Sequence, residues 1–434
     1  MRCNQWPHLR LGAVASVKGG KRLPKGELLK TEATPHPYIR VRDIGPNRRL
    51  SVNDGFEYVS RAVQQQIQRY TVRAGDVIIS IVGSIGLLAV IDLSLDGANL
   101  TENCAKIVDL DSVDGDFLYY YLSSDLGQDE IRKRTVGAVQ AKLPLKNIAD
   151  IPIPCPPLPE QRAIAAMLSC LDDKIELNNR MNKTLEEMAQ ALFKSWFVDF
   201  DPVKAKMEGR EPAGMDAETA ALFPDEFEDS ELGPIPKGWP CLTFGDVVKR
   251  CTLRTGSELM PVLSAVKTGE LVQSDEYFSK RVYSNDTAKY IIVEPLDFAY
   301  NPARINIGSI GINRTGSAGC VSPVYVVFRA RDTYQNYLDL LIRQDRLRSE
   351  IASRSSGSVR QTLDFVAFAG IRVAVPEFSV VDRFNSELGA LRATTRGLQE
   401  ETESLSTIRD TLLPKLMSGE IRVPEAEDIL EEVL

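Results

Sequence analysis

Two stretches of the chain share one hydrophobic pattern. Apolar residues recur in alternating steps of four and three over about residues 160–196, and again over about residues 380–416. This spacing gives the narrow apolar seam of a coiled coil, whereas an ordinary surface helix carries a broader apolar stripe. The pattern therefore predicts two long helices, each of which needs a partner helix.

The two stretches also superpose at one constant offset. The shift that places Ile164 on Phe384 also places Leu192 on Leu412. Because the sequence repeats, the natural partner of each helix is the other copy. The predicted seam consists of Ile164, Leu168, Leu171, Ile175, Asn178, Asn182, Leu185 and Leu192 in the first stretch, and of Phe384, Leu388, Leu391, Leu398, Leu405 and Leu412 in the second.

Amide and hydroxyl side chains interrupt this apolar seam. Asn178 and Asn182 occupy seam positions, and Thr402 stands at the position that matches Asn182. A buried polar residue in a seam lowers stability but fixes register and partner, because in any other register it would lack a hydrogen bond. The alternative is that these positions face solvent because the coil splays there.

The segments that precede the two long helices repeat as well, though more loosely. A Trp-Pro pair at Trp6 recurs at Trp239, and the Gly-Ser-Ile-Gly of residues 83–86 recurs at 308–311. These matches mark the start and the interior of two similar halves. The predicted layout is therefore domain, helix, domain, helix.

Each globular segment mixes short β-branched runs, such as 77–82, with helical stretches, such as 334–348. The sequence thus predicts an α+β fold of two globular domains, separated by two long antiparallel coiled-coil helices with internal pseudo-twofold symmetry. Its predicted parts are a first domain at 1–155, a first long helix at 156–200, an acidic Pro-containing connector at 201–238 with a short helix near 216–223, a second domain at 239–376, a second long helix at 377–420 and an acidic tail at 421–434.

The length and composition are those of an ordinary globular protein. At 434 residues the chain is too long for a single core and suits two domains. The longest uncharged apolar stretch, 77–91, is shorter than the roughly 20 residues that cross a bilayer, and the N-terminus lacks the pattern of a signal peptide. Seven cysteines without a CxxC spacing and two histidines without a metal pattern favour a reducing cytosol and speak against a disulfide framework.

The formal net charge of −8 is divided unevenly along the chain. The two globular segments, 1–155 and 239–376, carry net charges of +3 and +4, whereas 156–238 and 377–434 carry −8 and −7. The acidic residues therefore belong to the helical parts, and the globular parts are mildly basic. A weakly basic domain is compatible with nucleic acid as a partner, although Glu-rich helix surfaces could explain the same division.

Motifs that would indicate catalysis are missing from the sequence. It contains no phosphate-binding loop of the G-x-x-x-x-G-K-[ST] type, no H-E-x-x-H metal motif and no G-x-S-x-G nucleophile elbow. The Asn301-Pro302 pair is shared with adenine methylases, but no aromatic residue follows it and no Gly-rich cofactor loop precedes it. We therefore predict no catalytic residues and no metal site in this chain.

Several longer motifs resemble one protein family. Pro-Pro-Leu-Pro-Glu-Gln-Arg at 156–162 leads into the first long helix, and Leu-Leu-Pro-Lys-Leu-Met-Ser-Gly-Glu-Ile at 412–421 closes the second. The stretches at 194–205 and 233–239 are similar to the same family. Together with the duplicated layout, these motifs resemble the specificity subunit of type I restriction-modification systems over essentially the full chain.

The resemblance implies a division of labour among several subunits. In such a subunit each globular half is a target-recognition domain that reads one short half-site of double-stranded DNA, and the antiparallel helices hold the two halves apart. The family also implies two methyltransferase subunits docked on the helices and an ATP-driven restriction and translocase subunit. S-adenosylmethionine, ATP and magnesium are then expected on those partners, with no cofactor in this chain and no membrane partner.

Candidate DNA contacts follow from the chemistry of the duplex. Phosphates are bound by Lys and Arg, and base edges in the major groove by Arg on guanine and by Asn or Gln on adenine. Arg40 and Arg42 are expected to alternate along one strand face. The full set of candidates is Lys18, Lys21, Arg22, Lys25, Arg40, Arg42, Arg48 and Arg49 in the first domain, and Arg254, Lys267, Arg281, Arg304 and Arg360 in the second.

Two other functions are compatible with the same pattern. Two similar domains on a coiled coil could form a protein-binding scaffold without DNA specificity, and the modest charge of the domains favours this reading. The chain could also be a nuclease whose carboxylates are scattered along the sequence. Steep loss of DNA affinity with rising salt would distinguish the DNA reader from the scaffold, and magnesium-dependent cleavage by the isolated chain would identify the enzyme.

Overall fold

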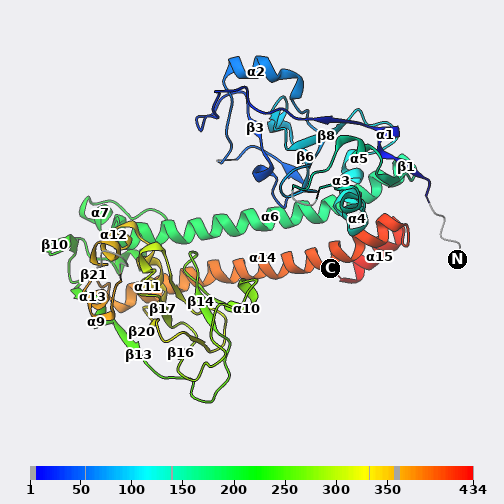
Figure 1. The fold of residues 1–434 in the computed structure, drawn as a ribbon. Coiled ribbons are helices and arrows are strands. Elements are labelled where there is room, and N and C mark those ends of the chain that lie inside the picture. Colours follow the sequence, from blue (N-terminus) through cyan, green and yellow to red (C-terminus); the bar gives the residue numbers. More distant parts are fainter. Residues whose placement is uncertain (1–5, 54, 138–139, 332, 356–361, 434) are drawn as a thin grey trace. The chain divides into compact units, whose positions relative to one another are not determined.

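A computed structural model describes residues 6–53, 55–137, 140–331, 333–355 and 362–433. The chain divides into two compact units, Met1–Asn182 with Arg396–Leu434, and Lys183–Thr395. Each unit contains one globular domain together with a stretch of each long helix (Figure 1). The combination of helices and sheets in both units is the predicted α+β architecture.

The first globular domain is built on a five-stranded sheet. Val77 and Ile79 on one face pack against helix α3 (Gly115–Ser123), and Ile78 on the other face packs into a separate cluster, so the sheet is buried on both sides. All pairings are antiparallel except that of β4 with β6. The strand order is β2 (Ser16–Gly19), β8 (Cys104–Val108), β5 (Val77–Ser80), β6 (Leu88–Ile91) and β4 (Arg49–Leu50).

Shorter elements complete the first unit. Strand β1 pairs with β9 in an antiparallel ribbon, which joins the start of the domain to the segment just before the first long helix. These elements are β1 (His8–Arg10), α1 (Leu11–Val14), β3 (Tyr38–Ile39), η1 (Val41–Asp43), α2 (Arg61–Ile67), η2 (Gln68–Tyr70), η3 (Leu93–Leu95), β7 (Asn99–Leu100), α4 (Asp125–Arg134), α5 (Leu145–Ala149), β9 (Pro152–Pro154) and α15 (Val423–Val433).

The second globular domain has a four-stranded antiparallel sheet in the order β13 (Val248–Cys251), β20 (Val326–Ala330), β17 (Phe298–Tyr300) and β18 (Ile310–Ile312). Two-stranded ribbons accompany it: β10 (Phe227–Ser230) with β11 (Gly233–Pro236), β12 (Cys241–Thr243) with β21 (Arg372–Ala374), β14 (Leu263–Ala265) with β15 (Leu271–Gln273), and β16 (Ile291–Val293) with β19 (Gly319–Val321). The shorter helices of the second unit are α7 (Asp201–Met207), α8 (Ala217–Ala221), α9 (Phe244–Val247), α10 (Ser274–Tyr277), η4 (Ile305–Ile307), α11 (Gln335–Ile342), α12 (Asp345–Arg354) and α13 (Phe365–Ala369).

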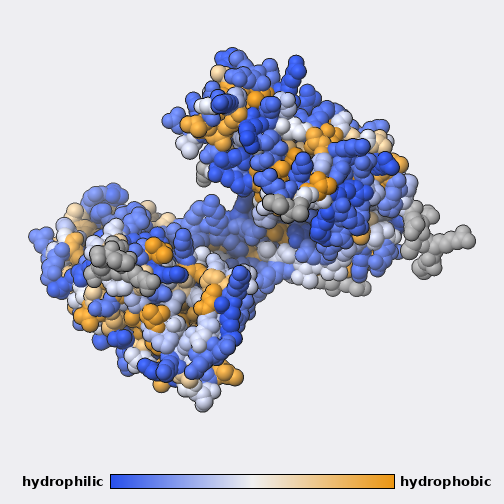
Figure 2. Space-filling view, in the orientation of Figure 1, coloured by the Kyte–Doolittle hydropathy of each residue, from blue (hydrophilic) through white to orange (hydrophobic). Residues whose placement is uncertain are grey.

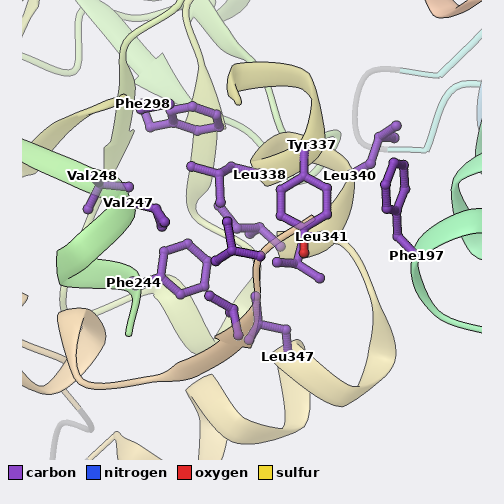
Figure 3. Close-up of a cluster of buried hydrophobic side chains, with 14 of the residues drawn as sticks. Phe197, Phe244, Val247, Val248, Phe298, Tyr337, Leu338, Leu340, Leu341 and Leu347 are labelled. Atoms are coloured by element: carbon purple, nitrogen blue, oxygen red, sulfur yellow. The ribbon is translucent and has the colours of Figure 1, made fainter. Parts of the chain in front are cut away.

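Large aromatic side chains fill the core of this second unit. Figure 3 shows Tyr337 and Leu338 of α11 between Phe244 and Phe298 of the domain and Phe197 at the end of the first long helix. The rings of Tyr337 and Phe197 meet edge to face, with centroids 5.1 Å apart. The globular domain and the long helix therefore share one hydrophobic core.

The internal repeat is visible element by element. Helices α4, α5 and α6 precede α12, α13 and α14 by one constant offset, and the same offset separates β9 from β21. The ribbons match as well, because β1 pairs with β9 in the same register as β12 pairs with β21. The most regular part of the repeat is thus the segment that joins each domain to its long helix.

The two long helices are α6 (Leu158–Phe197) and α14 (Phe378–Ser418). In the first unit Leu168 of α6 belongs to the same buried cluster as Leu405 and Leu412 of α14. In the second unit Phe193 of α6 contacts Phe384 of α14. The early part of each helix therefore packs with the late part of the other, which is an antiparallel pairing.

The predicted seam positions are buried to different degrees. Ile164, Leu168, Leu171 and Asn178 are buried in α6, as are Phe384, Leu388, Leu405 and Leu412 in α14. The remaining seam positions are half-buried: Ile175, Asn182, Leu185, Leu192, Leu391 and Leu398.

Asn178 makes a direct polar contact between the two long helices. Its side chain is fully buried, and its Nδ2 donates a hydrogen bond of 2.7 Å to Oε2 of Glu401. Lys174 pairs with the same carboxylate at 3.2 Å. Hydrogen bonds from Asn178 and Lys174 hold the pKa of Glu401 below its usual value of 4.5. Asn178 therefore does not face solvent. Its defined hydrogen-bond partner favours the interpretation that it fixes the register of the two helices.

Two segments differ from the sequence-based description. Residues 421–434 were expected to be an acidic tail, but α15 forms there because Ala426 is buried and Arg422 pairs with Glu160 of α6. The acidic connector contains α7, the expected short helix α8 and the ribbon β10–β11, and Val203 and Phe223 pack into the core of the second unit.

Candidate nucleic-acid interface

The candidate cations of the first domain fall into distinct environments. Lys18 on β2 pairs with Asp109 at 2.7 Å, and Nε of Arg22 lies 2.6 Å from Glu102. Both cations are more than half exposed. Exposed pairs of this kind contribute little to stability, so a phosphate can compete for these side chains. Lys25 is also exposed.

Arg40 and Arg42 do not alternate on a strand, so that expectation was wrong. Strand β3 ends at Ile39, and the Asp43 carboxylate accepts a hydrogen bond of 2.7 Å from the Arg40 backbone N–H, which starts the 3-10 helix η1. Glu57 pairs with both arginines, at 2.6 Å to Arg40 and 3.3 Å to Arg42. The shared carboxylate offsets part of their charge, and only Arg42 is more than half exposed.

Arg48 is buried, unlike the other candidates in this domain. Its side chain is 5% exposed and forms ion pairs with Asp116 at the start of α3 and with Asp173 of α6, the latter at 3.1 Å. The neighbouring Arg49 is 42% exposed and lies 3.4 Å from Asp116. The guanidinium of Arg48 thus links the sheet, α3 and the long helix, which is a structural position that leaves it inaccessible to a phosphate.

The candidates of the second domain lie on several different elements. Lys267 lines a cavity of about 480 Å³, whose wall also contains Arg343, Arg348 and the apolar residues of η4. The Arg281 guanidinium lies 4.5 Å from the ring centroid of Tyr283 and donates to Asn285. Arg254 and Arg304 are exposed. Arg360 lies outside the described residues.

A further basic element, which the sequence-based candidates do not include, follows Glu57. No Asp or Glu occurs between Glu57 and Asp76, and this run contains Arg61, Arg69 and Arg73. The same run holds four glutamines, at positions 64, 65, 66 and 68. It forms α2 and η2 at the margin of the first domain, on the side away from α6 (Figure 1). The absence of acidic residues over this run was the signal that could have identified it.

The loop that carries Lys21, Arg22 and Lys25 packs against this same element. Tyr38 and Val63 belong to a small buried cluster to which Leu23 of the loop contributes. The Tyr38 hydroxyl donates a hydrogen bond of 2.8 Å to the Lys21 carbonyl, and the Lys21 ammonium lies 5.7 Å from the ring centroid of Tyr70. The predicted basic loop and α2 therefore form one surface, which Figure 2 shows as mainly hydrophilic.

The described part of the chain contains no group of three or more His, Cys, Asp or Glu side chains placed to hold a metal ion. None of its helices combines the length and apolarity needed to cross a bilayer.

Comparisons with known proteins agree with this arrangement. The family described as type I restriction modification DNA specificity domain matches residues 4–187. The MjaIX specificity subunit of Methanocaldococcus jannaschii is 23% identical, covering 97% of this chain and 94% of its own length. The HindI specificity subunit of Haemophilus influenzae is 27% identical over 63% of this chain and 70% of its own length.

The fold comparison reaches the same group of proteins. A solved type I restriction-modification S subunit from M. genitalium superposes with a TM-score of 0.56 at 17% identity, covering 96% of this chain and 97% of the other. The fold and the matched sequences together define a two-domain DNA-recognition protein. Residues 4–187 thus match the DNA specificity domain of type I restriction-modification systems, and nearly the whole chain is similar to a specificity subunit of such a system.

Proposed function

We propose that each globular domain of this DNA-recognition subunit reads one half of a bipartite double-stranded DNA site, and that α6 and α14 set the spacer between the halves. The main observation behind the proposal is that the segment which joins a globular domain to its long helix occurs twice in the chain. Helices α5 and α6 and strand β9 recur as α13, α14 and β21 at one constant offset along the chain. Recognition of a two-part DNA site requires two domains, each joined to the long helices in the same way.

The length of the helices agrees with this role. At 1.5 Å per residue, the 40 residues of α6 span about 60 Å. At about 3.4 Å per base pair, that length corresponds to roughly 18 base pairs, or somewhat more than one and a half turns of duplex. A pair of such helices can hold two reading domains on one DNA molecule while the base pairs between them stay unread.

A spacer is useful only if each domain is firmly fixed to the helices. In the first unit the Tyr120 hydroxyl donates a hydrogen bond of 2.6 Å to Asp172 of α6, and Arg409 of α14 binds the same carboxylate at 2.8 Å. Burial and the nearby Asp172 raise the pKa of Tyr120, so its hydroxyl stays protonated and remains a donor. One carboxylate thus joins the domain to both long helices.

The second unit is fixed by aromatic packing and by a different polar contact. Phe193 of α6 lies against both Tyr337 of the domain and Phe384 of α14. Arg392 of α14 donates to Asn336 and lies 3.8 Å from Asp339 of α11. Helix α14 therefore supplies the cation Arg392 in the second unit. At the matching position in the first unit, α6 supplies the carboxylate of Asp172.

The proposal assigns the chemistry to partner subunits. Two methyltransferase subunits dock on the long helices, and exposed apolar side chains on α6 support this docking, with Leu177, Met181 and Met188 exposed by 44%, 41% and 52%. A restriction and translocase subunit completes the assembly. S-adenosylmethionine, ATP and magnesium act on those partners, and this chain supplies recognition without catalysis, in the cytoplasm.

Sequencing that detects methylated bases tests the proposal. DNA from cells that express the companion methyltransferase with this chain should carry a two-part motif with methylated adenine in both halves. The motif should be absent when the chain is omitted. A folded complex that produces no motif, or a continuous motif without an unread spacer, would refute the proposal and favour a protein-binding scaffold.

A further inference from the structure

Helix α2 presents a row of polar side chains in a regular arrangement. Its buried side is formed by Val63 and Ile67, which are 1% and 3% exposed. At 100° per residue, the direction opposite to these two positions is that of Gln65. Arg61 opens α2 near this direction, Arg69 follows in the 3-10 helix η2, and all three side chains are exposed.

The row has an unusually uniform electrostatic environment. The run from Tyr58 to Gly75 contains no acidic residue. Among the described residues, no carboxylate forms an ion pair with Arg61 or Arg69. This contrasts with Arg40, Arg42 and Arg48, whose guanidinium groups are paired with carboxylates. Two unpaired cations around a central amide attract an anionic ligand and leave their donors available to it.

The helix is also held rigidly at both ends. The Ser60 side chain caps its N-terminus by accepting a hydrogen bond from the Val63 backbone N–H at 3.3 Å. The buried Asn99 donates a hydrogen bond of 3.2 Å to the Ile67 carbonyl at the other end. Residues that recognise a ligand can discriminate better when they lie on a fixed element, because their positions are set before binding.

We propose that the exposed face of α2 enters the major groove of the DNA and reads part of one half-site. The inference rests on the proposed function and names the reading element of the first domain. The major groove, about 12 Å wide, admits one α-helix. Glutamine can form two hydrogen bonds with an adenine edge, and arginine can do so with guanine. The half-site read by this domain should therefore contain an adenine that depends on Gln65.

The dimensions of the row limit how much it can read. From Arg61 to Ile67 helix α2 rises by about 9 Å at 1.5 Å per residue, which equals roughly two to three base pairs. Lys21 and Lys25 lie on the loop that packs against the same small core as α2. They are placed to contact the flanking phosphates, which position the protein without carrying sequence information.

Substitution of Gln65 in the full-length chain tests the assignment. Co-expressed with the companion methyltransferase, Gln65→Ala should relax one position of one half-site, while the other half-site and the spacer stay unchanged. Gln65→Glu should change the preferred base at that position, because a carboxylate accepts from cytosine instead. Arg132→Ala, an exposed arginine on α4 of the same domain, is the matched control and should leave the motif unaltered.

Binding measured with the purified complex gives a second readout. At fixed salt, Gln65→Ala should weaken binding to the cognate duplex by about 5- to 150-fold, the range for one bidentate base contact. It should have little effect on a duplex already altered at that base pair. Arg61→Ala and Arg69→Ala should weaken cognate binding as well, and their thermal midpoints should stay near that of the unmodified protein because both side chains are exposed.

The outcomes separate this inference from the proposed function. If the unmodified chain yields no bipartite motif, the proposed function fails. If it yields one, and neither Gln65→Ala nor Gln65→Glu changes either half-site, α2 is not the reading element and the inference alone is refuted. Equal loss of both half-sites would also overturn it, because the effect would not belong to one domain.

Discussion

Replacing Arg48 distinguishes a structural arginine from a DNA contact. Its position in a basic stretch of the sequence suggested phosphate binding, but the folded chain buries its guanidinium between Asp116 and Asp173. We expect Arg48→Ala to lower the thermal stability of the protein. A loss of DNA binding would follow only as far as the first domain is loosened from α6.

The size of the effect can be worked out from the exposure of the three groups. Removing one member of a fully buried ion pair destabilises by about 3–5 kcal/mol because a charge is left uncompensated. Here Asp116 and Asp173 are 30% and 65% exposed, and Asp116 keeps Arg49 at 3.4 Å. Water can therefore solvate both carboxylates, and the expected loss is about 2 kcal/mol. For a unit of this size it lowers the midpoint by roughly 4–8 °C.

Thermal denaturation of the full-length protein, followed by circular dichroism, measures this loss. Arg49→Ala is the matched control, since Arg49 is the next residue, contacts the same Asp116 and is 42% exposed. Its midpoint should fall by no more than about 1–2 °C, as expected for an exposed pair worth under about 0.5 kcal/mol. The reasoning would be refuted if Arg48→Ala kept the original midpoint while DNA affinity dropped.

Three further predictions concern the long helices. Asn178→Leu should stabilise the protein by about 1 kcal/mol and raise its thermal midpoint, because an apolar seam residue replaces a buried amide. The variant Asn179→Leu, at the exposed neighbouring position, should change the midpoint little. A lower midpoint for Asn178→Leu would contradict the expectation. Hydrogen bonds from Asn178 and Lys174 lower the pKa of Glu401, so the stabilising contribution of its charge is present above about pH 4.5 and is lost as the pH falls further. The difference in stability between the unmodified protein and Glu401→Gln should therefore shrink on acidification. A difference that grew on acidification would contradict this prediction. Phe193→Ala should cost about 3–5 kcal/mol, since the ring is fully buried among aromatic neighbours, and a calorimetric loss below about 1 kcal/mol would exclude that role.

Much of the architecture could be predicted because it depends on local repetition. The four-and-three spacing of apolar residues predicted both long helices, and the offset between the two seams recurs in the helices and strands that precede them. The predicted helix at 334–348 is two helices, α11 and α12, because Gln344 adopts an extended conformation between them. No glycine or proline marks that break, so periodicity alone could not reveal it.

The details of the interface were harder to predict because they depend on distant partners. The burial of Arg48 requires Asp173, which lies 125 residues further along the chain. The expected strand at Arg40 and Arg42 fails because one residue, Asp43, caps a 3-10 turn. Helix α2 escaped notice for the opposite reason, since the arginines of its run, Arg61, Arg69 and Arg73, are spread four residues or more apart and only the absence of acidic residues marks the run.

If the long helices set the distance between two reading domains, a change in helix length must change the spacer of the DNA site. Seven residues inserted after Asn182 in α6 and seven inserted after Thr395 in α14 preserve the heptad phase within each unit, because both positions lie on the boundary between the units. Each insertion adds about 10.5 Å, or roughly three base pairs of DNA. We expect sequencing of methylated DNA to show both half-sites unchanged and a spacer roughly three base pairs longer. An active complex whose spacer keeps its original length would contradict it.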